Sequence, residues 1–268
     1  MRCLRPLLLI AAVALMLTPS IQAAVVFYDD FDGDGLSGLN GTTPDISTTG
    51  AMWEAGPGFL NDGTASGDTG SQAAHLDLAL EEGKMYIAEA TLLNDQRDWI
   101  GFGFFVRDIT FWTTSSSGNA RHSSGDAFDR AGGAIWMLTR NHSSANDQEG
   151  FKGAGTSTPQ SWNGDVVDPT EPIDMKVILD NRGDKTVGSY YLNGTLMSTT
   201  TFGSLILKPV GINDGNPGGG IGFSHTSDSD DLGGVLRSFK LTVVPEPSSI
   251  ALGVMGVAGL LVVVGRRV

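Results

Sequence analysis

The stretch Tyr191-Leu192-Asn193-Gly194-Thr195-Leu196 joins two short runs of β-prone residues through an Asn-Gly dipeptide. Asn-Gly is the preferred centre of a type I′ turn, because both central residues of that turn need a positive φ. The sequence therefore predicts a β-hairpin with strands over Thr186–Leu192 and Thr195–Thr201.

Other strand-length segments on both sides of this hairpin alternate bulky residues with polar residues or glycine, and clusters of Gly, Asn, Asp and Ser separate them. In Trp99–Val106, for example, glycine occupies one face and bulky residues the other. Helix signals are scarce, so residues 24–243 are predicted to form one all-β domain, an antiparallel β-sandwich or jelly roll. The remaining expected strands are Ala73–Leu80, Met85–Leu93, Ala134–Leu138, Ile173–Leu179, Gly220–Phe223 and Leu236–Val243.

Two polar, glycine-containing stretches interrupt this pattern, Thr113–Arg130 and Asn141–Asp168. Both exceed the usual connection length, which predicts long loops that either carry a binding site or are variable surface insertions. Trp112 and Trp162 lie beside these loops. Each tryptophan is a candidate platform for stacking on a sugar, or alternatively a plug at one end of the sandwich.

The charge of the chain bears on its partners. The whole chain has 17 basic and 30 acidic residues, and setting aside the arginines and Glu246 of the two ends leaves a net charge near −16 between residues 24 and 243. A surface this acidic argues against nucleic acid and anionic lipid as partners. It favours solubility and the binding of cations.

The first 23 residues have the organisation of a secretory signal peptide. Arg2 and Arg5 precede an apolar run over Leu7–Leu17, and small residues follow. Cleavage is expected after Ala23, or alternatively one residue later. The one cysteine of the chain, Cys3, leaves with the signal, so the mature protein is expected to contain neither a disulfide nor a thiolate.

Residues 244–268 combine three features in a fixed order: Pro245-Glu246-Pro247, an apolar run over Ile250–Val264, and Arg266-Arg267. The apolar run is close to the minimum for a transmembrane helix, and the arginines favour a cytoplasmic end. This order resembles the PEP-CTERM sorting signal of exported proteins in Gram-negative bacteria. That resemblance implies recognition by a membrane-embedded processing enzyme, exosortase, a transient inner-membrane anchor, and a surface location near exopolysaccharide. An ordinary tail anchor or a buried last helix are the alternatives.

A second resemblance covers nearly all of residues 24–243. Its motifs, in chain order, are Asp98–Phe104, the Asn193-Gly194 hairpin, Ile221-Gly222-Phe223 and the closing strand Leu236–Val243. Together they resemble the laminin-G-like and concanavalin-A-like jelly rolls. That superfamily implies two packed antiparallel sheets and a frequent role in binding carbohydrate or protein, and it also includes glycosidases.

The residues expected of an enzyme are largely missing from the sequence. Retaining glycosidases place two carboxylates about 5 Å apart, and in this fold they commonly alternate on one strand; no such run of acidic residues is present. The four histidines, His75, His122, His142 and His225, lack the spacing of a zinc protease. The sequence thus predicts a non-catalytic protein with a structural or adhesive role in the envelope or exopolysaccharide matrix. A carbohydrate-binding or carbohydrate-cleaving jelly roll is the alternative.

An acidic stretch near the start of the domain is a candidate calcium site. Asp30, Asp32 and Asp34 occupy alternating positions in Asp29–Gly35, where glycines allow a tight turn, and oxygen ligands at this density suit Ca²⁺. Only the first half of an EF-hand loop is matched. The first and last strands of a jelly roll often lie together, so Asp228, Asp230 or Asp231 are expected to complete the site. The alternative is a solvated turn, with Asp and Gly chosen for turn geometry.

Overall fold

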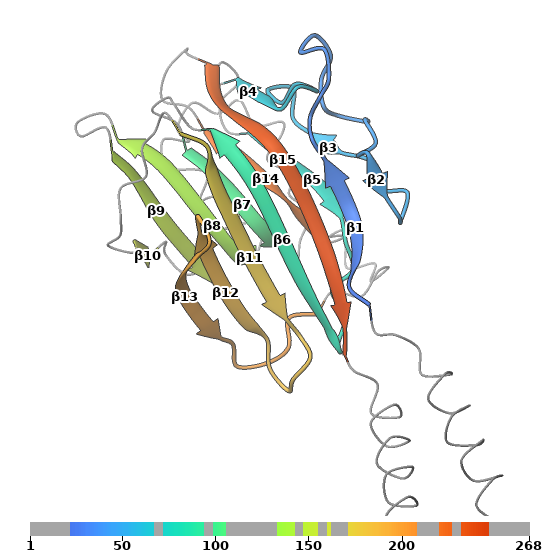
Figure 1. Ribbon diagram of the computed structural model, residues 1–268, viewed down its shortest axis with the longest axis vertical. Helices are drawn as coiled ribbons and strands as arrows, with labels where there is room; N and C mark the ends of the chain where they lie inside the picture. The colour runs from blue at the N-terminus through green and yellow to red at the C-terminus, as the bar shows by residue number, and fades with distance from the viewer. Residues whose placement is uncertain are drawn as a thin grey trace, which may run out of the picture.

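The computed structural model describes residues 22–66, 72–93, 99–105, 133–142, 147–154, 160–161, 171–207, 220–226 and 232–246. These residues form two sheets that pack face to face, and the strand pairs within both sheets are antiparallel (Figure 1). The predicted all-β, antiparallel β-sandwich is confirmed. Sequence-distant strands neighbour one another in both sheets, as in a jelly roll.

The first sheet, within the described residues, has eight strands in the order β13-β12-β11-β6-β15-β1-β2, and β4 pairs with one end of β15. The bounds of its strands are β1 Ala24–Asp29, β2 Ile46–Ser47, β4 Thr64–Ser66, β6 Lys84–Leu93, β11 Ile173–Asp180, β12 Val187–Leu192, β13 Thr195–Thr201 and β15 Leu232–Pro245.

The second sheet has seven strands within the described residues, in the order β10-β9-β8-β7-β14-β5-β3. The bounds of its strands are β3 Glu54–Ala55, β5 Gln72–Asp77, β7 Trp99–Phe105, β8 Gly133–His142, β9 Asp147–Ala154, β10 Gln160–Ser161 and β14 Gly220–Thr226.

The expected loop over Asn141–Asp168 is wrong in part. β8 continues to His142, and β9 and β10 follow within the segment that was expected to be loop. β9 reads D-Q-E-G-F-K-G-A, which lacks the apolar alternation from which a strand can be predicted. The other expected loop, Thr113–Arg130, lies outside the described residues.

Alternation of inward and outward side chains builds the core. On β6 and β11 buried positions alternate with partly exposed ones, as the period of a strand requires. On β7 the bulky residues Ile100, Phe102 and Phe104 are buried in the core, and Gly101 and Gly103 occupy the opposite face. The predicted division of that strand into a bulky face and a glycine face is therefore confirmed.

An aromatic cluster joins the two sheets. Phe102 of β7 and Phe223 of β14 stack with their ring centroids 5.2 Å apart. Phe239 of β15 meets these two rings from the opposite sheet, at 6.2 and 5.8 Å. Trp53, just before β3, contacts Phe239 at 5.6 Å, so the segment between β1 and β5 is anchored to the same cluster.

The first and last strands of the sandwich lie side by side, as the sequence predicts. Ala24 at the start of β1 pairs with Val243 near the end of β15 (Figure 1). β15 continues two residues beyond its expected end, and Pro245 pairs with Lys84. No helix among the described residues is long and apolar enough to cross a membrane. Both apolar segments predicted from the sequence lie outside those residues.

The hairpin between β12 and β13 has the predicted turn. Asn193 and Gly194 have φ values of 46° and 77°, as a type I′ turn requires. The side-chain oxygen of Asn193 also accepts a hydrogen bond from the backbone N–H of Asp174, which ties the turn to the start of β11.

Replacing Gly194 by alanine is expected to destabilise the protein by about 1 kcal/mol, because alanine is strained at a positive φ. Gly203→Ala is the matched control, since a Cβ at either position meets no atom within 4 Å and only Gly194 has a positive φ. Urea denaturation of the two variants measures the difference. Equal loss of stability in both would contradict the turn assignment.

Candidate functional site

The outer faces of the two sheets differ in chemistry. On the eight-stranded sheet, Glu89 lies between two lysines of neighbouring strands, with its carboxylate 3.2 Å from the Nζ of Lys176 and 2.6 Å from that of Lys240. Burial opposes ionisation of Glu89, but the two ammonium groups outweigh it and lower its pKa. This face has the ladder of opposite charges that stabilises an ordinary solvated sheet.

The outer face of the seven-stranded sheet carries a row that crosses five strands. The row consists of Trp136, Gly103, Gly222, His75 and Glu54, each paired with the next. Trp136 and His75 are almost fully buried although they point away from the inter-sheet core, with exposures of 0% and 2%. A Cβ on Gly222 would lie 2.8 Å from the Cα of His75, so the two strands can approach this closely only because residue 222 is glycine.

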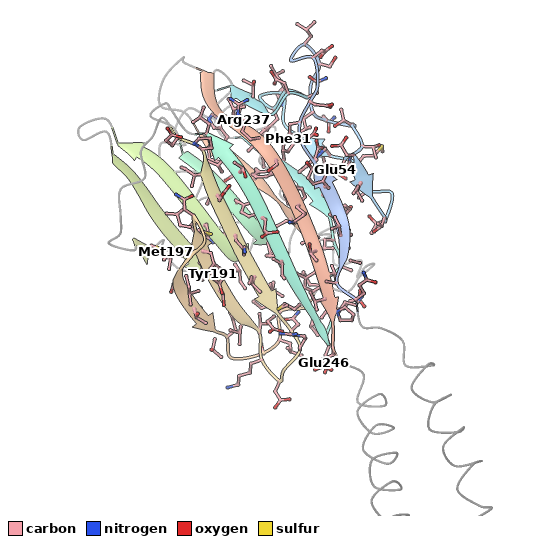
Figure 2. The ribbon with its side chains drawn as sticks, in the orientation of Figure 1. Phe31, Glu54, Tyr191, Met197, Arg237 and Glu246 are labelled. Atoms are coloured by element: carbon pink, nitrogen blue, oxygen red, sulfur yellow. The ribbon has the colours of Figure 1, made fainter. Side chains whose placement is uncertain are left out.

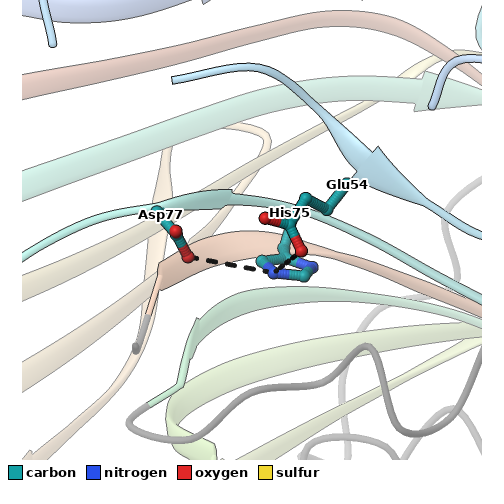
Figure 3. Close-up of side chains that lie close together, drawn as sticks. All are labelled: Glu54, His75 and Asp77. Atoms are coloured by element: carbon teal, nitrogen blue, oxygen red, sulfur yellow. Dashed lines mark ion pairs between the residues drawn. The ribbon is translucent and has the colours of Figure 1, made fainter. Parts of the chain in front are cut away.

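Glu54, His75 and Asp77 bring three ionisable side chains together at the edge of this face (Figure 3). His75 and Asp77 are two residues apart on β5 and therefore share a face, and Glu54 of β3 pairs directly with His75. The Nε2 atom of His75 lies 3.6 Å from a carboxylate oxygen of Glu54 and 4.0 Å from one of Asp77. The two carboxylates are more than half exposed, whereas the imidazole is buried.

A pocket of about 280 Å³ adjoins this group, and both carboxylates belong to its wall. The wall of the pocket contains hydrogen-bonding groups and the side chain of Met52. Most of its residues belong to the loops that precede β3. The lining residues are Asn40, Gly41, Ala51, Met52, Trp53, Glu54 and Asp77.

Trp53 links this region to the acidic start of the domain. Its side chain is fully buried, and its indole Nε1 donates a 2.6 Å hydrogen bond to Asp29 of β1. The other carboxylate oxygen of Asp29 accepts the N–H of Phe31. Burial raises the pKa of Asp29, although these two donors oppose the rise.

Asp29, Asp30 and Asp45 form a second acidic group, with a carboxylate oxygen of each within 4.8 Å of the others. Reduced hydration, followed by repulsion from Asp45 and Asp32, raises the pKa of Asp30. The three carboxylate oxygens lie close enough together to bind a single cation. The group contains Asp30, which the calcium prediction named as a ligand. Its other two members, Asp29 and Asp45, were not named as ligands in that prediction.

The other residues of the calcium prediction have different surroundings. Asp34 caps its own turn, because its Oδ1 accepts hydrogen bonds from the N–H groups of Leu36 and Ser37 and from the amide of Asn61. These donors lower the pKa of Asp34. Asp32 does not join the group of three. Asp228, Asp230 and Asp231 lie outside the described residues, as do Trp112 and Trp162.

Only the start of the predicted sorting motif lies within the described residues. Pro245 ends β15, and Glu246 is exposed there, with its N–H bonded to the carbonyl of Gly83 (Figure 2). Glu54 lies well away from Glu246 along the molecule (Figure 2). Pro247, Arg266 and Arg267 lie outside the described residues.

Sequence reasoning missed the group formed by Glu54, His75 and Asp77. The period-2 alternation of Ala73–Leu80 could have placed His75 and Asp77 on one face. No local signal could have supplied Glu54, because its position depends on the pairing of β3 with β5.

No family model and no curated protein matches the sequence. Among solved structures, the chain is similar to an endo-1,3-beta-glucanase from Streptomyces sioyaensis, with 12% identity, a TM-score of 0.43 and coverage of 85% of this chain and 98% of that one. It is also similar to the potassium-bound Emp46p carbohydrate recognition domain, with 15% identity, a TM-score of 0.47 and coverage of 70% and 87%. Peanut lectin is 10% identical, with a TM-score of 0.46 and coverage of 83% and 98%.

Removing one carboxylate from the second acidic group is expected to stabilise the protein when no divalent cation is present. Because the pKa of Asp30 is raised by folding, its ionisation costs stability as the pH rises from the unfolded value of 3.8 through the folded value. Asp30→Asn should therefore raise the melting temperature in chelator at neutral pH and have no such effect below that window.

The calcium prediction is tested in the same experiment. Calcium should raise the melting temperature of the parent protein and have little effect on Asp30→Asn. Asp184→Asn, at an exposed position, controls for the general loss of one negative charge. If millimolar calcium leaves the parent unchanged, the acidic stretch is a turn and nothing more.

Proposed function

We propose that this protein is exported and sorted to the cell surface, where its β-sandwich is a non-catalytic structural or adhesive module. One observation carries the proposal: Ala24, immediately after the predicted signal peptide, pairs with Val243, immediately before the sorting motif. Both targeting segments therefore leave the sandwich from neighbouring strands at one end. A membrane that holds either segment would meet the same end of the folded domain.

The position of Glu246 supports recognition at this end. It is exposed, so a processing enzyme can reach its side chain, while its N–H is bonded to the carbonyl of Gly83 at 2.7 Å. Folding thus fixes where the sorting motif starts relative to the domain. The proposed partners are an exosortase-type enzyme, the inner membrane before processing, and exopolysaccharide at the final location.

The sorting tail is expected to be removed from the mature protein. Mass spectrometry of the protein isolated from the surface of its native host should find no peptide from Ser248–Val268. A Glu246→Ala variant, changed only in the motif, should retain those peptides. Recovery of Arg266-Arg267 in surface protein of the parent sequence would identify a permanent tail anchor instead.

A second candidate function is the binding or cleavage of carbohydrate. The pocket beside Glu54 and Asp77 favours it, because carboxylate and amide groups are good partners for sugar hydroxyls. These two carboxylates have oxygens within 4.8 Å of each other, close to the separation in retaining glycosidases. However, the imidazole of His75 lies between them, where a glycosidic oxygen would have to be (Figure 3). This arrangement favours binding over hydrolysis.

A reducing-sugar release assay on the processed protein is expected to show no activity with surface polysaccharides. A glycan array with the same material then separates an adhesive protein from a purely structural one. Sugar release that Glu54→Gln abolishes would show that the protein is an enzyme and would overturn the non-catalytic assignment. Asp62→Asn, another carboxylate in the loops of the same half of the domain, is the control for that variant.

A further inference from the structure

The spacing within the Glu54, His75 and Asp77 group does not match direct hydrogen bonding. Protein N–H···O hydrogen bonds measure about 2.7–3.2 Å, whereas His75 Nε2 lies 3.6 and 4.0 Å from the two carboxylate oxygens. A tetrahedral metal ion with ligands at about 2.1 Å holds those ligand atoms roughly 3.4 Å apart. The two separations from His75 exceed this value by about 0.2 and 0.6 Å, and the two carboxylate oxygens lie within 4.8 Å of each other, so small movements of the carboxylates would bring all three ligand atoms onto one ion.

The sheet fixes the backbone positions of the three residues. Glu54 and His75 face each other on paired strands, and Asp77 follows on the same face of β5. Burial restricts the imidazole, and the glycine at position 222 allows β14 to lie close beside His75 on the side away from Glu54. A buried imidazole and paired backbone positions, set before binding, avoid part of the entropy cost of ordering ligands around an ion.

The chemistry of the ligands selects the kind of ion. One imidazole nitrogen and two carboxylate oxygens suit first-row divalent metals such as Zn²⁺, whereas Ca²⁺ and Mg²⁺ prefer oxygen ligands alone. Two carboxylates balance the charge of a divalent ion. The adjoining pocket, lined by both of them, gives the remaining coordination position access to water or to an oxygen-bearing ligand.

We propose that Glu54, His75 and Asp77 form a binding site for a divalent transition-metal ion of the Zn²⁺ class at the edge of the seven-stranded sheet. The site shares no residue with the predicted calcium site. It goes beyond the proposed surface function and does not depend on it.

The test is calorimetric titration of the full-length, untagged protein in detergent with ZnCl₂, after treatment with chelator. One saturable site is expected. Glu54→Gln and Asp77→Asn should each weaken Zn²⁺ binding at least tenfold, and His75→Asn by roughly 100-fold, since even changes to groups that only support a ligand cost 10- to 100-fold. Cobalt bound at the same site should give the intense visible absorption of tetrahedral Co²⁺, and Zn²⁺ should displace it.

Asp45→Asn is the matched control, because it removes a carboxylate from the other acidic group and should leave Zn²⁺ binding unchanged. Circular dichroism verifies that each variant is folded. Glu54 and Asp77 are more than half exposed, so their variants remain informative even if His75→Asn fails to fold. Absence of saturable Zn²⁺ binding overturns the proposal. So does equal affinity in the parent, Glu54→Gln and Asp77→Asn, or a preference for Ca²⁺ that Asp45→Asn removes.

Discussion

Contact between Phe239 of one sheet and Phe102 and Phe223 of the other is the interaction on which the sandwich depends. All three rings are fully buried, and truncating one such ring to alanine typically costs about 3–5 kcal/mol. The cluster is possible because β7 and β14 place their aromatic residues inward and glycine outward. The same alternation that builds the core therefore removes side chains from the outer face of the seven-stranded sheet.

The outward-facing glycines of β7 and β14 determine what lies beside the candidate site. Gly222 and Gly103 lie side by side between His75 and Trp136, and a side chain at either glycine would collide with the neighbouring strand. Trp53 and Glu54 then connect the two acidic regions through a single peptide: the indole points inward to Asp29, and the carboxylate points outward to His75. A shift of register in β3 would reverse both directions and disrupt both groups at once.

Both groups of ionisable side chains, Glu54 with His75 and Asp77, and Asp29 with Asp30 and Asp45, belong to a domain with a negative net charge. An acidic protein attracts cations in general. Among the residues that the structure describes, two groups of ionisable side chains converge closely enough to hold one. Repulsion within the group of Asp29, Asp30 and Asp45 contributes to the raised pKa values of the first two. At Asp34, by contrast, backbone and amide donors stabilise the charge, so this carboxylate functions as a turn cap.

The strands that the sequence could predict are those that bury one face, because burial imposes an alternation that can be read locally. The Asn-Gly turn could be read for a similar reason, since its positive φ values restrict the residues that fit. β9 could not be predicted, because its sequence D-Q-E-G-F-K-G-A lacks that alternation and only its backbone pairing with β8 shows that it is a strand.

The sequence by itself determined the all-β class, the hairpin, the glycine face of β7, and the shared face of His75 and Asp77. These features follow from periodicity and local φ preferences. The tertiary structure alone decided that Glu54 faces His75, that Asp45 approaches Asp29 and Asp30, and that Ala24 pairs with Val243. Those contacts join residues that are distant in sequence, and their positions are fixed by strand register, which depends on how the whole core packs.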